Sequence, residues 1–167
     1  DVYNREEALK EVEREPLSFL AIDRAETQFD SSVDTYADCV YDKARELLDS
    51  RIADGTFITD TDKAYYVYEL TMNGRTQTGI AACASIDDYN NNIIKKHENT
   101  RADKEQDRIN HVDRCSAQTG PIFLAYRADE VIRNEVVKAK ETKPLYSFTS
   151  PDGIRPVSYT HLTLPTT

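Results

Sequence analysis

The side chains best suited to chemistry lie in one charged stretch, residues 94–113. Within it, Arg101, Lys104, Arg108 and His111 are spaced three, four and three residues apart, so on a helix they would share one face. Cationic groups close to a helix N-terminus, where unpaired N–H groups already attract anions, suit a phosphate. The spacing therefore predicts a phosphate-binding helix face.

Charged residues just before and within this helix extend the predicted site. Lysine and histidine side chains would add donors for phosphate oxygens, and glutamates would act as general bases or, with neighbouring aspartates, hold a magnesium ion. The candidate catalytic residues are Glu98 and Glu105, and the candidate phosphate-binding residues are Lys96, His97, Arg101, Lys104, Arg108 and His111.

The same residues also fit a helix that binds nothing. Acidic and basic side chains alternate along it, which is typical of a solvated helix stabilised by ion pairs four residues apart. The sequence contains no glycine-rich phosphate loop, no Ser-x-x-Lys motif and no His-Glu-x-x-His motif. Both interpretations stay open on this pattern alone.

Composition and charge limit the class of protein. The 167 residues carry a formal net charge of -9, which argues against a protein that mainly binds nucleic acid, because that needs a surplus of Lys and Arg. The apolar runs are far too short to cross a bilayer. Three widely spaced cysteines form neither a disulfide framework nor a zinc motif, so we expect a soluble, cytoplasmic protein.

The spacing of apolar residues and the positions of turn and capping residues predict the elements that must hold this site. We expect helices over residues 5–14, 36–53, 87–96, 100–114 and 129–140, the first opened by an Asn4–Glu7 capping box and the fourth by Thr100. We expect strands over residues 17–22, 56–58, 64–71, 76–85, 122–126, 145–148 and from 154 onward, with a tight type I′ turn at Asn73-Gly74. The fold class is therefore α+β, with a mixed, largely antiparallel sheet, β-hairpins and flanking helices.

Both ends of the chain suggest a fragment of a longer protein. The chain begins without methionine, directly before the capped helix, and residues 157–167 hold no charged side chain. The DNA of an adapter used in sequencing libraries, translated in one reading frame, can encode these eleven residues. We therefore expect residues 1–156 to be the truncated N-terminal part of a single α+β domain, and residues 157–167 to be a non-native tail.

Several motifs in the chain resemble a known bacterial family. Residues 94–98 read Ile-Lys-Lys-His-Glu, residues 103–105 read Asp-Lys-Glu, and residues 111–113 read His-Val-Asp. Gln-Thr-Gly precedes them at 77–79, and Thr-Gly-Pro-Ile-Phe-Leu follows at 119–124. Together these motifs resemble the family called domain of unknown function 1015, over essentially residues 1–155.

The resemblance implies a considerably longer protein whose later half carries an Asp-Gly-His-His-Arg stretch, similar to the phosphate-binding turn of the ParB and sulfiredoxin superfamily. That superfamily includes kinases that phosphorylate free serine. The resemblance thus implies an ATP-dependent phosphotransferase acting on a small hydroxylated metabolite such as L-serine, with ATP and magnesium as cofactors. Two alternatives stay open: a nucleotide-binding regulatory or DNA-partitioning module of the ParB kind without metabolite turnover, and a non-catalytic structural half of a larger site.

Overall fold

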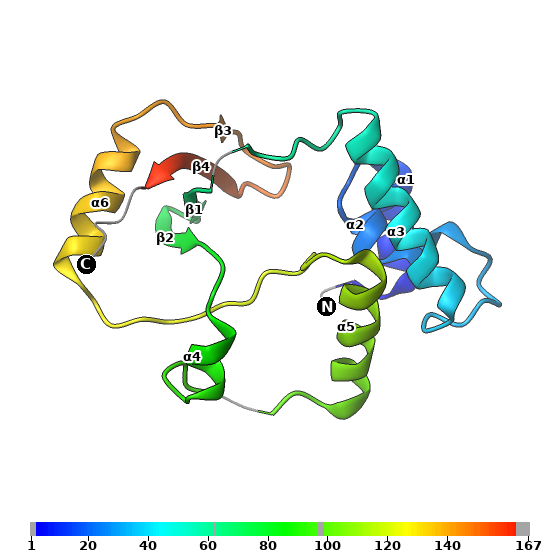
Figure 1. Ribbon diagram of the computed structural model, residues 1–167. Helices are drawn as coiled ribbons and strands as arrows, with labels where there is room; N and C mark the ends of the chain where they lie inside the picture. The colour runs from blue at the N-terminus through cyan, green and yellow to red at the C-terminus, as the bar shows by residue number, and fades with distance from the viewer. Residues whose placement is uncertain (1–2, 62, 97–98, 163–167) are drawn as a thin grey trace. The chain divides into compact units, whose positions relative to one another are not determined.

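The computed structural model describes residues 3–61, 63–96 and 99–162, which form two compact units (Figure 1). Unit 1 comprises Asp1–Thr59 with His97–Phe123, and unit 2 comprises Asp60–Lys96 with Leu124–Thr167. Helices accompany a four-stranded antiparallel sheet, which confirms the predicted α+β class. Within the described ranges, every helix is too short or too polar to traverse a lipid bilayer.

Unit 1 is built from helices. Its elements are α1 (Arg5–Arg14), α2 (Leu20–Asp23), the 3-10 helix η1 (Ala25–Gln28), α3 (Asp38–Ala53) and α5 (Ala102–Cys115). One apolar core joins them, and its buried members are Ile22, Ala25, Val40, Ala44 and Cys115. Because this burial removes apolar surface from water, it holds α5 against helices that lie far from it in the sequence.

Two arginines fix the loops between the helices of unit 1. Arg51, only 5% exposed, donates hydrogen bonds of 2.6–3.3 Å to the carbonyl oxygens of residues 16–18. Arg5 donates to four carbonyl oxygens between residues 26 and 33. Carbonyl oxygens can accept more than one hydrogen bond, and these guanidinium groups add to the turn hydrogen bonds that Ser18, Glu26 and Asp30 already accept.

Unit 2 is built around a sheet with the strand order β2-β1-β4-β3. The strands are β1 (Tyr65–Met72), β2 (Arg75–Ala81), β3 (Tyr146–Ser147) and β4 (Arg155–Leu162), and the helices are α4 (Ile86–Asn90) and α6 (Glu130–Lys140). Helix α6 covers one face, where Ala139 packs against Val67, with Ile80, Val136 and Tyr159 around them. Strand β2 is an edge strand, and β1 is its one neighbour among the strands that the structure describes.

The strongest local sequence signals are confirmed. At the N-terminus of α1, the Asn4 side chain accepts from the Glu7 N–H, and the Glu7 carboxylate accepts from the Asn4 N–H at 2.8 Å. Between β1 and β2, Asn73 and Gly74 both adopt positive φ, 52° and 74°, as a type I′ turn requires. Asp129 caps α6 as predicted.

Two predicted strands in unit 1 are wrong. Residues 17–22 contain helix α2 instead, because the Ser18 hydroxyl accepts from the Leu20 N–H and the following turn buries Ala21 and Ile22. A short apolar run fits a buried strand and a buried helical turn equally well. Residues 56–58 form no strand either, since Asp54 accepts from the Thr56 N–H and closes a turn after α3.

Three further predictions, one strand and two helix boundaries, differ from the structure. Residues 122–126 form no strand and are exposed, with Phe123 83% exposed, so their apolar character does not reflect a buried position here. Helix α4 ends at Asn90, and Asn92 follows in the left-handed region at φ 59°, which asparagine tolerates better than most residues. Helix α5 starts at Ala102 with Arg101 at the capping position, so Thr100 is not its cap.

The end of the described chain belongs to the sheet of unit 2. Strand β4 continues to Leu162 and pairs with β1, and Val157 and Ser158 are buried. The division into residues 1–156 and a non-native tail over 157–167 stays a prediction.

Candidate functional site

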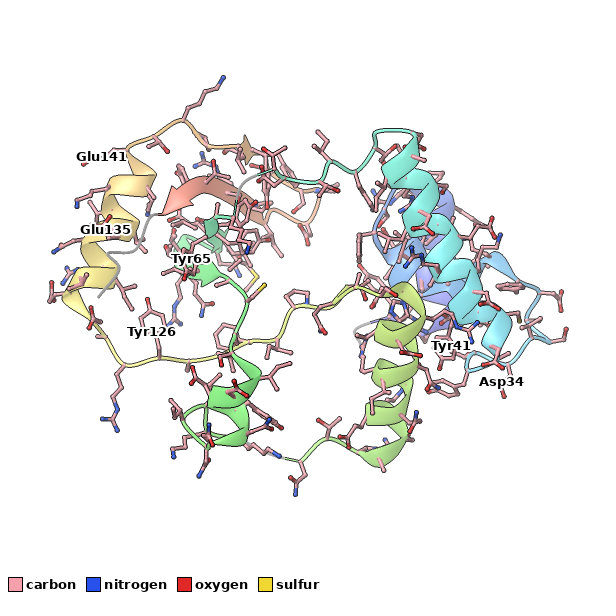
Figure 2. All side chains as sticks on the ribbon, in the orientation of Figure 1. Asp34, Tyr41, Tyr65, Tyr126, Glu135 and Glu141 are labelled. Carbon is pink, nitrogen blue, oxygen red and sulfur yellow. The ribbon has the colours of Figure 1, made fainter. Side chains whose placement is uncertain are left out.

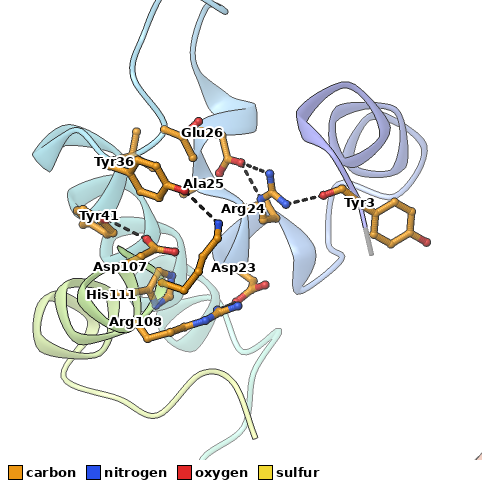
Figure 3. Close-up of a pocket in the computed structure, with 13 residues that line it drawn as sticks. Tyr3, Asp23, Arg24, Ala25, Glu26, Tyr36, Tyr41, Asp107, Arg108 and His111 are labelled. Atoms are coloured by element: carbon orange, nitrogen blue, oxygen red, sulfur yellow. Dashed lines mark hydrogen bonds and ion pairs between the residues drawn. The ribbon is translucent and has the colours of Figure 1, made fainter. Parts of the chain in front are cut away.

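Helix α5 brings part of the predicted phosphate-binding face to a pocket in unit 1 (Figure 3). Lys104, Asp107, Arg108 and His111 line it, because residues three, four and seven apart on a helix share one face. The pocket has a volume of about 210 Å³. Its other walls come from the N-terminal part of the chain and consist of Tyr3, Asp23, Arg24, Ala25, Glu26, Thr35, Tyr36, Val40 and Tyr41.

The formal charges of the pocket side chains balance when histidine is counted as neutral. The three cations are Arg24, Lys104 and Arg108, and the three carboxylates are Asp23, Glu26 and Asp107. Glu26 is almost fully buried and pairs with Arg24 at 2.6 Å, whereas the pair between Arg108 and Asp23, at 3.2 Å, is far more exposed. A buried carboxylate is stable only with such a partner, so Arg24 and Glu26 form a fixed part of the wall.

Tyrosines from α3 and the loop before it hold two of the α5 side chains. The Tyr41 hydroxyl donates to the Asp107 carboxylate at 2.9 Å. Burial, followed by this contact with Asp107, raises the pKa of Tyr41 to about 12, because both disfavour the phenolate. Lys104 donates to the Tyr36 hydroxyl at 3.1 Å, and its ammonium lies 5.6 Å from the centre of that ring. The pocket is therefore organised before any ligand binds.

His111 has protein partners on both ring nitrogens. Nε2 lies 3.1 Å from the Ile22 carbonyl oxygen, and Nδ1 lies 3.1 Å from the Thr119 hydroxyl. The side chain is only 8% exposed and meets the Tyr41 ring edge-on. These contacts anchor α5 to α2, and the predicted donation from His111 to a phosphate stays a prediction.

Cys115 lies one helical turn beyond His111, with its sulfur 3.8 Å from Nδ1. Burial raises the pKa of the Cys115 thiol, which keeps it protonated and poorly nucleophilic. The proximity of these two residues is therefore a packing contact.

The remaining predicted site residues do not line the pocket. Arg101 is exposed and pairs with Asp103 at 2.8 Å, and Glu105 is exposed on the first turn of α5. Lys96 belongs to unit 2, where its ammonium lies 4.7 Å from the centre of the Tyr89 ring. The predictions for His97 and Glu98 fall outside the described residues.

The cofactors implied by the resemblance, ATP and magnesium, stay a prediction. Among the residues that the structure describes, no three His, Cys, Asp or Glu side chains are grouped as an all-protein metal site would need, whereas magnesium usually takes one or two carboxylates together with substrate phosphates. A volume of about 210 Å³ also lies below the roughly 300–1,000 Å³ typical of drug-sized ligands. The pocket thus suits a small molecule that carries both charges, and no step through magnesium or a whole nucleotide can be assigned to it.

Sequence reasoning missed the N-terminal half of this pocket. Asp23, Arg24 and Glu26 follow the strand predicted over residues 17–22, and they have no periodicity of their own. The one available signal is that three of the four residues after the apolar run 20–22 are charged. That position marks the end of a buried turn, where side chains can reach a pocket.

The fold and pocket define an α+β protein with a small, charge-balanced pocket beside a helix. The family model described as "Protein of unknown function (DUF1015)" matches residues 1–160. The chain therefore belongs to the DUF1015 family, which confirms the predicted family resemblance. Comparison with curated proteins finds no match, and neither does comparison with solved structures.

Proposed function

We propose that the intact protein is an ATP-dependent phosphotransferase acting on a small hydroxylated metabolite, with free L-serine as the first candidate, and that the unit 1 pocket binds this acceptor. The observation that carries the proposal is the pocket of about 210 Å³ with balanced charges. A free amino acid is small and zwitterionic, so it needs a cation and a carboxylate within one pocket.

The proposed roles follow from the side chains in the pocket. Lys104 and Arg108 would hold the carboxylate of the acceptor, because both are cations on the same face of α5. Asp107 and Asp23 would hold its ammonium group, because Glu26 is buried against Arg24. Bound ATP supplies the phosphoryl group, and the chain's own contribution is to bind and orient the acceptor hydroxyl.

Binding of L-serine by the 167-residue chain, measured by titration calorimetry without nucleotide, tests the acceptor site directly. We expect Arg108→Gln to weaken binding about tenfold, because it removes a charged hydrogen-bonding group. Arg101→Gln, on the same helix but outside the pocket, is the matched control and should bind like the wild type. Two half-ligands refine the test: glycerate lacks the ammonium group and ethanolamine lacks the carboxylate, so each should bind more weakly than serine.

Other outcomes separate the competing functions. Glycerate binding as tightly as serine would contradict the zwitterion pocket. Formation of phosphoserine and ADP by the full-length protein supports the transferase, whereas tight nucleotide binding without turnover of any acceptor would replace it by a nucleotide-sensing module. Serine binding that is unchanged in Arg108→Gln would leave α5 with a purely structural role.

A further inference from the structure

A second pocket lies within unit 2, beside edge strand β2. Its volume is about 390 Å³, larger than that of the unit 1 pocket. It is lined by Thr78, Gly79 and Ile80 of β2, by Tyr126, Ala128 and Asp129 before α6, and by Glu130, Arg133 and Val136 of α6. In Figure 2, Tyr126 projects from the chain just before α6, toward the sheet.

The side chains of this pocket favour an uncharged, flat ligand. Ile80 and Val136 supply an apolar base where α6 meets the sheet, and Tyr126 supplies an exposed aromatic face. The polar side chains already have protein partners: the Thr78 hydroxyl donates to Glu69 at 3.0 Å, and Arg133 pairs with Glu130 at 3.3 Å. Asp129 accepts from the first N–H groups of α6, so a carboxylate already occupies that helix end.

The edge of β2 supplies main-chain hydrogen-bonding groups to the same pocket. Met72 and Arg75 close a two-residue hairpin, and the ladder alternates between hydrogen-bonded and non-hydrogen-bonded pairs from there. By that alternation, Thr78 and Ile80 direct their N–H and C=O groups away from β1. Among the described residues, no hydrogen bond outside the sheet ladder engages these two N–H groups.

The outward N–H and C=O of one strand residue form a donor beside an acceptor. Adenine presents its N6–H donor beside an N7 acceptor, which complements such a pair. Guanine presents two acceptors, O6 and N7, at that edge and offers a donor beside an acceptor only at its other edge, with N1–H and O6. An aromatic side chain beside this edge would stack on the ring of either base.

We propose that the unit 2 pocket is an adenine-binding site, in which Tyr126 stacks on the ring and the outward main-chain groups of Thr78 or Ile80 pair with its edge. The balance of Asp129, Glu130 and Arg133 leaves no cationic surplus for phosphates, so the recognised group is the base. This site does not depend on the proposed phosphotransfer, because all its residues belong to unit 2.

The test is calorimetric titration of the 167-residue chain with adenosine and, separately, with N6,N6-dimethyladenosine, which has no N6–H donor. We expect adenosine to bind and the dimethyl analogue to bind at least about tenfold more weakly, since one base-edge mismatch is worth about 1–3 kcal/mol. Tyr126→Ala should weaken adenosine binding about tenfold by removing the stacked ring. Tyr89→Ala removes an exposed aromatic ring elsewhere in unit 2 and is the matched control.

Proline substitution tests the main-chain contact. Thr78→Pro removes an N–H that points away from the ladder, a change that edge strands tolerate. Thr76→Pro makes the same change at the neighbouring outward position, which lies outside the pocket. Each variant also loses one hydroxyl contact to β1, Thr76 to Thr71 and Thr78 to Glu69. We expect Thr78→Pro to weaken adenosine binding at least about threefold and Thr76→Pro to leave it unchanged.

The proposal is overturned if adenosine does not bind, if N6,N6-dimethyladenosine binds equally well, or if Tyr126→Ala binds adenosine like the wild type. If both proline variants lose adenosine binding, circular dichroism shows whether they are still folded. Equal loss of binding in two folded variants would also contradict the proposal. L-Serine binding should be the same in Tyr126→Ala as in the wild type, so failure of this site and failure of the proposed acceptor site are distinguishable.

Discussion

At the residue scale, each carboxylate of the unit 1 pocket is held by a donor from another part of the chain. Asp107 accepts from Tyr41, Glu26 pairs with Arg24, and Asp23 pairs with Arg108. A ligand that enters must exchange some of these contacts for its own. The more exposed pair of Asp23 and Arg108 costs the least to open, because solvent already screens it.

Tyr41 leads to a prediction about stability at high pH. In the folded protein its pKa is about 12, against 10.0 for an ordinary tyrosine. Below pH 10 both states keep the proton and the stabilisation is fully present. As pH rises toward 12 the unfolded chain loses the proton first, so stability should fall by on the order of 2 kcal/mol.

Urea unfolding at several pH values between about 9 and 11.5, for the wild type and Tyr41→Phe, measures this loss. Other titrating groups act on both proteins, so the difference between the two unfolding free energies isolates Tyr41. That difference should shrink as pH rises, because the substituted phenylalanine ring has no proton to lose. A difference that stays constant over this range would show that Tyr41 is not held protonated by the fold.

Sequence reasoning found the α5 half of the pocket and missed the residues that complete it. The spacing of Lys104, Arg108 and His111 was sufficient to place them on one face, because helical geometry is local. It did not reveal that His111 Nε2 contacts the Ile22 carbonyl oxygen and Nδ1 contacts the Thr119 hydroxyl, since those contacts depend on how helices pack. Charge pairing across the pocket is likewise a property of tertiary structure.

At the element scale, the Asn73-Gly74 turn and the Asn4 cap were predicted correctly, whereas the Thr100 cap and the short apolar runs were not. The Asn73-Gly74 turn and the capping box at Asn4 follow from backbone preferences of a few residues. Residues 17–22 and 122–126 are apolar in both cases, yet the first forms a buried helical turn and the second is exposed. Whether such a run forms a buried turn or stays exposed depends on the apolar side chains that the rest of the fold places beside it.

The hairpin between β1 and β2 gives a prediction with an internal control. Gly74 has φ 74°, where a Cβ is strained, so Gly74→Ala should destabilise unit 2 by about 1–2 kcal/mol. Gly79 lies in the same hairpin without positive φ, and a Cβ there meets no heavy atom within 4 Å. Gly79→Ala should therefore be neutral or stabilise by up to about 1 kcal/mol.

Urea unfolding followed by the tyrosine signal measures this contrast, because seven of the ten tyrosines lie in unit 2. Both substitutions add one methyl group to one hairpin, so they differ mainly in backbone conformation. Equal destabilisation by the two variants would contradict the assignment of strain to the turn.

At the scale of the whole molecule, charge is distributed very unevenly between the two units. Unit 2 contains ten acidic and ten basic residues, whereas unit 1 contains twenty acidic and eleven basic residues. The entire formal charge of -9 therefore falls on unit 1. Like charges concentrated in one compact unit repel one another and lower its stability, an effect that salt reduces.

Raising NaCl from about 0.02 M to about 0.5 M shortens the screening length from about 20 Å to about 4 Å. We expect this to stabilise unit 1 more than unit 2, because only unit 1 has a net charge to screen. Circular dichroism at a helical wavelength reports mainly on α1, α3 and α5, and the tyrosine signal mainly on unit 2, so one urea titration follows both. The urea midpoint from the helical signal should rise with salt while the tyrosine midpoint changes little. A general effect of salt on protein hydration would move both midpoints equally, and that result would refute an electrostatic origin confined to unit 1.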